Sequence, residues 1–194
     1  QRGILMQEAV PVGEGAMAAI LALDAAAIEE VTGAMEGVWI ANYNCPGQIV
    51  ISGEKAAVEE ACEKLKAAGA KRAVMLNVSG PFHSGMLADA GEKLGEVLSQ
   101  VELHEPQIPY VANVTAQYVK SAAEVKELLT RQVSSSVRWQ QSVEAMIADG
   151  VDTFIEIGPG KTLAGFMRKI SRDVKTLNVE NLEDIGKVAE ALKS

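Results

Sequence analysis

One of the only two histidines in the chain, His83, lies in the segment Ser79-Gly80-Pro81-Phe82-His83-Ser84-Gly85. An imidazole takes up and releases a proton near neutral pH, so His83 is a candidate general base. Apolar residues 73–78 predict a strand before the segment, and residues 86–101 predict an amphipathic helix after it. Loops between such elements often carry catalytic groups, but this segment alone is equally consistent with a packing or surface histidine.

A histidine base needs a nucleophile, and in α/β enzymes this is often a serine in a Gly-x-Ser-x-Gly turn. Ser52, Ser79 and Ser84 lack the flanking glycines of such a turn, and residues 134–136, three consecutive serines, have no glycine beside them. Cys45 has no basic neighbour in the sequence to lower its pKa, so it is expected to be a small apolar residue in a turn. If His83 is catalytic, its nucleophile is absent from these residues.

Composition narrows the class of protein. The 194 residues are 48% apolar and 23% charged, which is typical of a globular chain with a sizeable core. A net charge of −8 with dispersed basic residues argues against a nucleic-acid or anionic-membrane surface. The apolar run at residues 16–23 ends at Asp24, far short of the roughly 20 residues that span a bilayer. Cys45 and Cys62 lack metal-site or redox spacing, which favours a reducing, cytoplasmic setting and predicts no metal.

Residues 15–78 alternate between strand and helix patterns. The turn Asn44-Cys45-Pro46-Gly47 predicts a hairpin between two of the strands, and Asp24 is the expected N-cap of the helix that follows it. The resulting order βαββαβ predicts a ferredoxin-like subdomain. Its expected strands are residues 16–23, 38–43, 48–52 and 73–78, and its expected helices are residues 25–35 and 54–68.

The remaining residues predict a larger layered α/β domain with a largely parallel sheet, formed by residues 1–14 and 79–194. Ser121 and Glu124 have the spacing of a capping box and predict a helix start. His104, in a polar connection, is expected to be exposed. The expected strands are residues 110–114, 153–157 and 174–178, and the expected helices are residues 86–101, 138–148, 162–170 and 182–192.

Four segments in order carry a family resemblance. They are Gln1-Arg2-Gly3 with Met6-Gln7-Glu8-Ala9, then residues 41–48 (Ala-Asn-Tyr-Asn-Cys-Pro-Gly-Gln), then residues 79–84, and then residues 156–160 (Glu-Ile-Gly-Pro-Gly). Together they resemble the C-terminal part of malonyl-CoA:acyl-carrier-protein transacylases and of the related acyltransferase domains of fatty-acid and polyketide synthases. The resemblance covers nearly the whole chain. It implies a partial α/β-hydrolase-like acyltransferase core with the ferredoxin-like subdomain inserted.

The resemblance also implies roles for individual residues. In the family a serine in a G-H-S-x-G turn carries the acyl group, and it lies upstream of the arginine matched by Arg2, so this chain is expected to be a C-terminal fragment without that serine. His83 would take the proton of the serine, and the backbone carbonyl of Gln132 would orient the imidazole. Arg2 would hold the malonyl carboxylate through paired hydrogen bonds, which a planar guanidinium makes well.

Four further residues are expected to contact substrate. Phe82 matches the pattern of malonyl-selective members, in which a bulky ring excludes a branched methylmalonyl group, although a ring beside a helix start is also ordinary core packing. Asn42, Asn44 and Gln48 offer amides for the pantetheine or thioester region. Asparagine beside Pro-Gly is equally common in turns, so both interpretations stay open.

The function implied by the resemblance is two-step transfer of a malonyl group from malonyl-CoA to the phosphopantetheine thiol of acyl carrier protein, in cytoplasmic fatty-acid biosynthesis and without a cofactor. The expected partners are malonyl-CoA, acyl carrier protein and the missing N-terminal portion of the same protein, and the isolated chain is expected to be inactive. Two alternatives remain from the sequence. One is an acyltransferase fragment of a polyketide synthase, and the other is a non-catalytic module that binds carrier protein.

Overall fold

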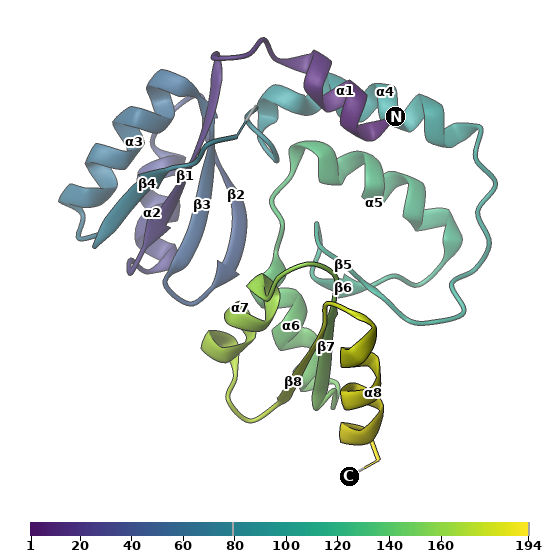
Figure 1. Cartoon of the computed structure of the whole chain (residues 1–194). Coiled ribbons are helices and arrows are strands. Elements are labelled where there is room, and N and C mark those ends of the chain that lie inside the picture. Colours follow the sequence, from purple (N-terminus) through teal and green to yellow (C-terminus); the bar gives the residue numbers. More distant parts are fainter. Residues whose placement is uncertain (79, 194) are drawn as a thin grey trace. The chain divides into compact units, whose positions relative to one another are not determined.

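The computed structural model describes residues 1–78 and 80–193. Ser79, the first residue of the segment that contains His83, and Ser194 lie outside the described residues. The chain divides into two compact units, residues 1–142 and residues 143–194 (Figure 1). Helix α6 (Trp139–Ala148) runs across the division.

The first unit contains a four-stranded antiparallel sheet in the order β2-β3-β1-β4. The βαββαβ order predicted for residues 15–78 is confirmed, and the ends of the elements differ from the predicted ends by a few residues. A tight turn at Pro46 and Gly47 joins β2 to β3, as the sequence predicts. The elements are β1 (Gly15–Leu21), α2 (Ala25–Gly33), β2 (Val38–Cys45), β3 (Gln48–Glu54), α3 (Lys55–Ala67) and β4 (Arg72–Met75).

Successive side chains of a strand point to opposite faces of the sheet, and in this sheet both faces carry apolar side chains. On one face, Ile20 and Ile51 pack with Ile28 of α2 and Leu65 of α3 in the main core of the unit. Helices α2 and α3 cover this face (Figure 1). On the other face, Met17, Ala41 and Val50 form a smaller cluster against which Phe82 packs. The sheet therefore presents an apolar floor to the segment that carries His83.

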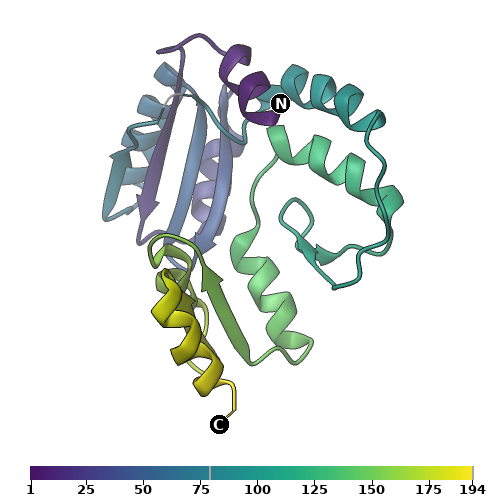
Figure 2. The same ribbon diagram turned by 45° about the vertical axis from the view of Figure 1, so that its right-hand side comes forward.

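A helical layer completes the first unit. It comprises α1 (Arg2–Ala9), the single 3₁₀ turn η1 (Gly85–Leu87), α4 (Ala88–Ser99) and α5 (Ala122–Ser134), and Figure 2 shows α4 and α5 side by side. Their common core consists of Met6, Val10, Leu87, Ala90, Leu94 and Val133. The close approach of α4 and α5 depends on Gly91, where an added Cβ would lie 3.0 Å from the carbonyl oxygen of Thr130. The helix predicted at residues 86–101 is thus present and begins with a 3₁₀ turn.

Two predicted helix caps are not formed by their side chains. Asp24 and Ser121 occupy the N-cap positions of α2 and α5, but neither side chain accepts a cap hydrogen bond. At α5 a carboxylate from a distant loop takes that role, because Glu105 Oε2 accepts from the backbone N–H of Ala122 at 2.9 Å. The capping box predicted at Ser121 and Glu124 is therefore wrong in its contacts, although the helix starts where the sequence predicts.

The predicted strand at residues 110–114 is much shorter than expected. β5 (Val111–Ala112) pairs in antiparallel orientation with β6 (Gln117–Tyr118), and the reversal between them places Ala116 at a positive φ of 56°. Among the described residues, parallel pairing is limited to β7 (Thr153–Ile157) with β8 (Lys175–Val179) and to a bridge between Asn42 and Val137. The prediction of a largely parallel sheet is therefore wrong for residues 110–114, because a local turn pairs this strand with its neighbour in sequence.

The second unit contains β7 (Thr153–Ile157), α7 (Thr162–Ile170), β8 (Lys175–Val179) and α8 (Leu182–Ala191), all close to the predicted positions. The two strands are parallel, since α7 provides the crossover between them. Glu156 caps α7, because its two carboxylate oxygens accept from the backbone N–H groups of Leu163 at 3.1 Å and Ala164 at 2.7 Å.

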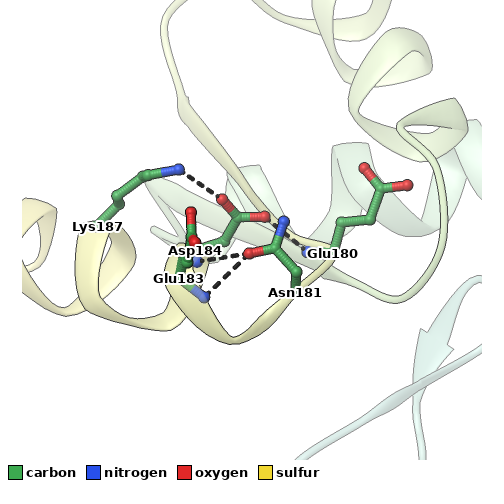
Figure 3. A network of polar contacts seen from close by, with 5 residues as sticks. All are labelled: Glu180, Asn181, Glu183, Asp184 and Lys187. Carbon is green, nitrogen blue, oxygen red and sulfur yellow. Dashed lines mark hydrogen bonds and ion pairs between the residues drawn. The ribbon is translucent and has the colours of Figure 1, made fainter.

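The start of α8 has its own polar network (Figure 3). Asn181 Oδ1 accepts from the backbone N–H groups of Glu183 at 3.0 Å and Asp184 at 3.2 Å, so the asparagine caps the helix. Asp184 in turn accepts from Lys187 Nζ at 2.9 Å, and this bond lowers the pKa of the Asp184 carboxyl. None of the helices in the described part of the chain has the length and apolar character needed to cross a membrane.

Candidate active site around His83

A tight turn holds His83. The hydroxyl of the buried Ser84 donates to the carbonyl oxygen of Pro81 at 2.7 Å, and Pro81 is itself fully buried. Gly15 gives the proline ring room, since a Cβ there would lie only 2.3 Å from it. Within this turn His83 has a φ of 60°, which is rare for a residue with a side chain and costs about 1–3 kcal/mol. Packing around the turn therefore fixes the backbone that presents the imidazole.

The imidazole is oriented by a backbone group at the end of α5. Nδ1 of His83 lies 2.9 Å from the carbonyl oxygen of Gln132. A carbonyl only accepts hydrogen bonds, so Nδ1 carries the proton and Nε2 keeps a lone pair. The carbonyl is free for this contact because α5 ends at Ser134, and the last four carbonyls of a helix have no partner within it. The negative end of the helix dipole favours a positive charge on the same ring.

Four influences act on the pKa of His83. Burial has the largest effect and lowers the pKa, the Gln132 carbonyl raises it, the charge of Arg2 lowers it, and the carbonyl of Ser135 raises it. The net result is a pKa below the ordinary value for histidine. The ring is therefore neutral at physiological pH, which is the state that a proton acceptor requires.

His83 and Arg2 line the same cavity, of about 510 Å³. Helix α1 supplies Arg2, whose guanidinium forms no ion pair with any described residue. The rest of the lining comes from α1, from the apolar floor of the sheet and from the loop before His83: Gly3, Met6, Gln7, Met17, Asn42, Val50, Leu76, Val78 and Phe82. The cavity thus combines one cation and one neutral imidazole with mostly apolar walls.

The structure brings together some of the predicted site residues and leaves others apart. Arg2, Phe82, Asn42 and His83 line one cavity, and Gln132 reaches His83 through its carbonyl. Asn44 and Gln48 are partly buried near the hairpin turn, and they line neither this cavity nor the second one described below. Their predicted substrate contacts therefore remain predictions without support from the geometry.

A second cavity, of about 320 Å³, lies beside the first and also includes His83 in its lining. Its other residues are Trp39, Ile40, Val114, Arg131, Ser134, Ser135, Ser136 and Arg138. Sequence reasoning considered the three serines only as nucleophiles and missed the role of this segment as a wall of the site. The signal that could have found it is the serine run immediately after a predicted helix, flanked by two arginines.

Two contacts shape the second cavity. The ring of Trp39 packs over Gly85, where a Cβ would lie 2.7 Å from the indole. The guanidinium of Arg138 lies 5.8 Å from the centre of the Tyr43 ring, and the Tyr43 hydroxyl donates to Glu29 Oε1 at 2.8 Å. Burial, followed by the bond to Glu29, raises the pKa of Tyr43 to about 12, so the ring stays neutral beside the arginine.

The described residues contain no candidate set of metal ligands. Across residues 1–78 and 80–193, no group of three or more histidine, cysteine, aspartate or glutamate side chains is arranged to hold a metal ion. In the cavity lined by both residues, the imidazole of His83 is able to accept a proton and the guanidinium of Arg2 is able to bind an anion.

Comparison with known proteins places this chain in a family. Residues 1–191 match the acyl transferase domain family. The chain belongs to this family. The resemblance seen in the four sequence segments is thereby confirmed, and so is the α/β fold class, since solved malonyltransferase structures superpose closely on the chain.

The relatives are consistent in name. The chain is 50% identical to the malonyl CoA-acyl carrier protein transacylase of Bacillus subtilis, over all of this chain and 62% of that protein. It is 43% identical to the protein of the same name from Staphylococcus aureus strain COL, over 95% of this chain and 61% of that protein. The chain thus spans about three fifths of the length of the curated relatives it matches.

Solved structures give the same result. An acyl carrier protein S-malonyltransferase from Vibrio cholerae has a TM-score of 0.94 and 42% identity, covering 96% of this chain and 62% of the other. A malonyl-transacylase solved in complex with a holo acyl carrier protein of a type II polyketide synthase has a TM-score of 0.95 and 41% identity, covering 98% of this chain and 62% of the other.

Proposed function

We propose that the complete acyltransferase transfers a malonyl group from malonyl-CoA to the phosphopantetheine thiol of acyl carrier protein in fatty-acid biosynthesis. The observation that carries the proposal is the single cavity lined by a neutral, oriented imidazole and by an arginine without an ion pair. The names of the relatives support the choice of acyl group and acceptor. The nucleophilic serine is expected in a part of the protein outside these residues.

In the proposed first step, Nε2 of His83 takes the proton of that serine as its oxygen attacks the thioester carbonyl of malonyl-CoA. The carbon–sulfur bond then breaks, and the imidazolium returns the proton to the departing CoA thiolate. In the second step His83 deprotonates the carrier thiol, whose sulfur attacks the malonyl-serine ester, and the proton returns to the serine oxygen. The Gln132 carbonyl supports the imidazolium in both steps, although less strongly than a carboxylate would.

Arg2 is proposed to select the acyl group. A malonyl carboxylate in the cavity would receive two parallel hydrogen bonds from the guanidinium, whereas an acetyl group would leave that cation without a partner. Arg2 is exposed in the described structure, so this cost, on the order of a few kcal/mol for a desolvated charge, requires that the rest of the complete protein shields the guanidinium from water. Phe82, which packs against the sheet on the same cavity, is proposed to restrict branching at the α carbon.

The amides of Asn42, Asn44 and Gln48 are proposed to contact the pantetheine or thioester region. The support differs among the three, since only Asn42 lines the cavity that contains His83.

The finer description of the fold belongs to the same proposal. The sheet order β2-β3-β1-β4 with α2 and α3 on one face supports a ferredoxin-like subdomain at residues 15–78, inserted in an α/β-hydrolase-like domain formed by residues 1–14 and 79–194. Malonyl-CoA, acyl carrier protein and an N-terminal portion of the same protein are the proposed partners. The proposed reaction needs no cofactor, and its proposed location is the cytoplasm.

The test compares this 194-residue chain with a chimera that carries the N-terminal portion of the Bacillus subtilis relative in front of it. Malonyl transfer is measured by the mass of holo acyl carrier protein after incubation with malonyl-CoA. We expect no transfer by the chain alone and transfer by the chimera, reduced by about 10²–10⁴-fold in His83→Ala. Transfer by the chain alone that is lost in His83→Ala would contradict the proposal and point to Cys45 or a serine within these residues.

The same experiment separates the alternative of a binding module. A chimera that binds carrier protein in a pull-down but transfers no malonyl group would contradict catalysis and support recognition alone. Arg2→Ala in the chimera gives the second readout. We expect it to reduce malonyl transfer while leaving acetyl transfer unchanged or raised, because only the malonyl group has a carboxylate for the guanidinium.

A further inference from the structure

The end of α5 is held by a side chain as well as by the backbone. Gln132 Nε2 donates to the carbonyl oxygen of Ser135 at 3.0 Å and to that of Ser136 at 3.3 Å. These carbonyls belong to the first residues beyond the helix, where the chain turns into an extended conformation. One amide group thus closes the turn that leads out of α5.

The residues after this turn are fixed on the small sheet. Ser136 Oγ donates to the carbonyl oxygen of Ile40 at 2.5 Å. Val137 donates through its backbone N–H to Ala41 at 2.8 Å and accepts from Tyr43 at 2.9 Å. The segment between Gln132 and Val137 is therefore attached at both ends, by the glutamine amide to the helix and by three hydrogen bonds to β2.

His83 contacts this attached segment. The Gln132 carbonyl accepts from Nδ1 at 2.9 Å, and the carbonyl of Ser135, which the Gln132 amide also binds, acts on the same ring. The backbone group that orients the imidazole and the side chain that closes the turn thus belong to one residue. Loss of the amide would release the Ser135 carbonyl and let the end of α5 move against the ring.

We propose that the side-chain amide of Gln132 is a positioning group for His83, which fixes the end of α5 so that the Gln132 carbonyl remains on Nδ1 and Nε2 remains free. This role explains why a glutamine side chain is useful at a position where only the backbone faces the imidazole. The expected effect of the Gln132 amide on malonyl transfer rests on the function proposed above, whereas its effect on the position of the His83 ring does not.

The first test uses the chain itself, since its two histidines give a simple spectrum. Ring ¹⁵N shifts of His83 report which nitrogen carries the proton, and exposed His104 serves as an internal reference. Gln132→Met has a side chain of similar length that cannot donate. We expect its His83 shifts to move from a single Nδ1–H form toward a mixture of tautomers, with the pKa of His83 lowered further, while His104 is unchanged.

The matched control is Gln100→Met. Gln100 also lies at a helix end, as the C-cap of α4, and its amide also donates locally, to Ser99 Oγ at 3.0 Å, but in the described part of the chain no hydrogen bond joins this amide to a histidine. We expect wild-type His83 shifts in this control. Gln132→Asn is the second test variant, because it keeps the amide on a side chain too short to reach the carbonyls of both Ser135 and Ser136. If Gln132→Met does not fold, the ring shifts of Gln132→Asn decide whether the amide positions His83.

The charged groups around the ring are Arg2 from α1 together with Arg131 and Arg138 at the second cavity, and none of them is altered in these variants. In the chimera we expect Gln132→Met to lower kcat about tenfold with a change in KM of less than about twofold, since the Arg2 cavity is untouched. Wild-type ring shifts and kcat in both Gln132 variants would overturn the proposal. A parent chimera without transfer would instead overturn the proposed function, and the ring spectra would still decide the role of the Gln132 amide.

Discussion

The antiparallel sheet of the first unit and the parallel strand pair of the second unit bury their side chains to different extents. In β3, five consecutive residues from Ile49 to Gly53 are buried, and apolar clusters cover both faces of the sheet. In β7 and β8 no residue is buried, Ile157 is 79% exposed, and α8 has no buried residue at all. One region thus has a core of its own, whereas the buried side chains of the second unit lie in its helices, at Val143, Ala164 and Met167.

The groups around His83 take their rigidity from the densely packed first unit. The turn of His83, the floor of its cavity and the segment that follows α5 all rest on the well-packed first unit. A proton acceptor must stay within a fraction of an ångström of its productive position, and dense packing supplies that precision. All of the described residues that line the two cavities around His83 belong to the first unit.

The largest expected effect that tests this contrast comes from matched truncations. Ile51→Ala removes a fully buried side chain of the main core and should lower the free energy of unfolding of the first unit by about 2–5 kcal/mol. Ile157→Ala, at an exposed position, should change stability by less than about 0.5 kcal/mol. Urea unfolding followed by circular dichroism measures both. Equal losses would show that the two regions are packed alike.

Two glycine-to-alanine substitutions should change the stability of the chain in opposite directions. Gly85→Ala would place a Cβ 2.7 Å from the Trp39 ring and should destabilise the chain by about 1–3 kcal/mol through overpacking. Gly165→Ala lies in α7, where nothing is within 4 Å, and should stabilise by up to about 1 kcal/mol because alanine favours a helix. Thermal unfolding of the two variants is the measurement. A stabilising Gly85→Ala would contradict the packing described for Trp39.

The smallest expected effect concerns pH. Burial lowers the pKa of His83 in the folded state, so the unfolded chain binds more protons and stability falls as pH falls through 6.5 toward the folded pKa. This part of the pH dependence should disappear in His83→Gln and persist in His104→Gln. Urea unfolding at several pH values between 5 and 8 compares the three proteins. An identical slope in His83→Gln and the wild type would mean that burial does not perturb the imidazole.

The sequence predicted most of the secondary structure because its signals are local. Pro46-Gly47 marks the hairpin, alternating apolar residues mark the strands, and α7 begins and ends where its pattern does. The caps of α2 and α5 were predicted wrongly because a side chain beside a helix start does not have to bond to it, and a distant Glu105 takes that place at α5. The strand predicted at residues 110–114 is shorter than expected and not part of a parallel sheet, because a local turn pairs Val111 and Ala112 with the next residues in the sequence.

The site was predictable only in part. His83 was visible from its residue type, whereas Arg2 and Gln132 came from the family resemblance, because 49 residues separate Gln132 from the ring that its carbonyl binds. The cavity wall of Arg131, Arg138 and the serine run depends on how the segment after α5 attaches to β2, and no local pattern encodes that attachment. Contacts of this kind follow from tertiary structure.

The positive φ of His83 has a consequence for the evolution of the site. At φ 60° the backbone favours glycine, which has no Cβ to collide with the carbonyl groups around it. The position therefore involves a trade-off between stability and activity, because the residue that would make the turn most stable is one that cannot transfer a proton. Variants that gain stability at position 83 should be those that lose the imidazole, and selection for stability alone would remove the proposed base.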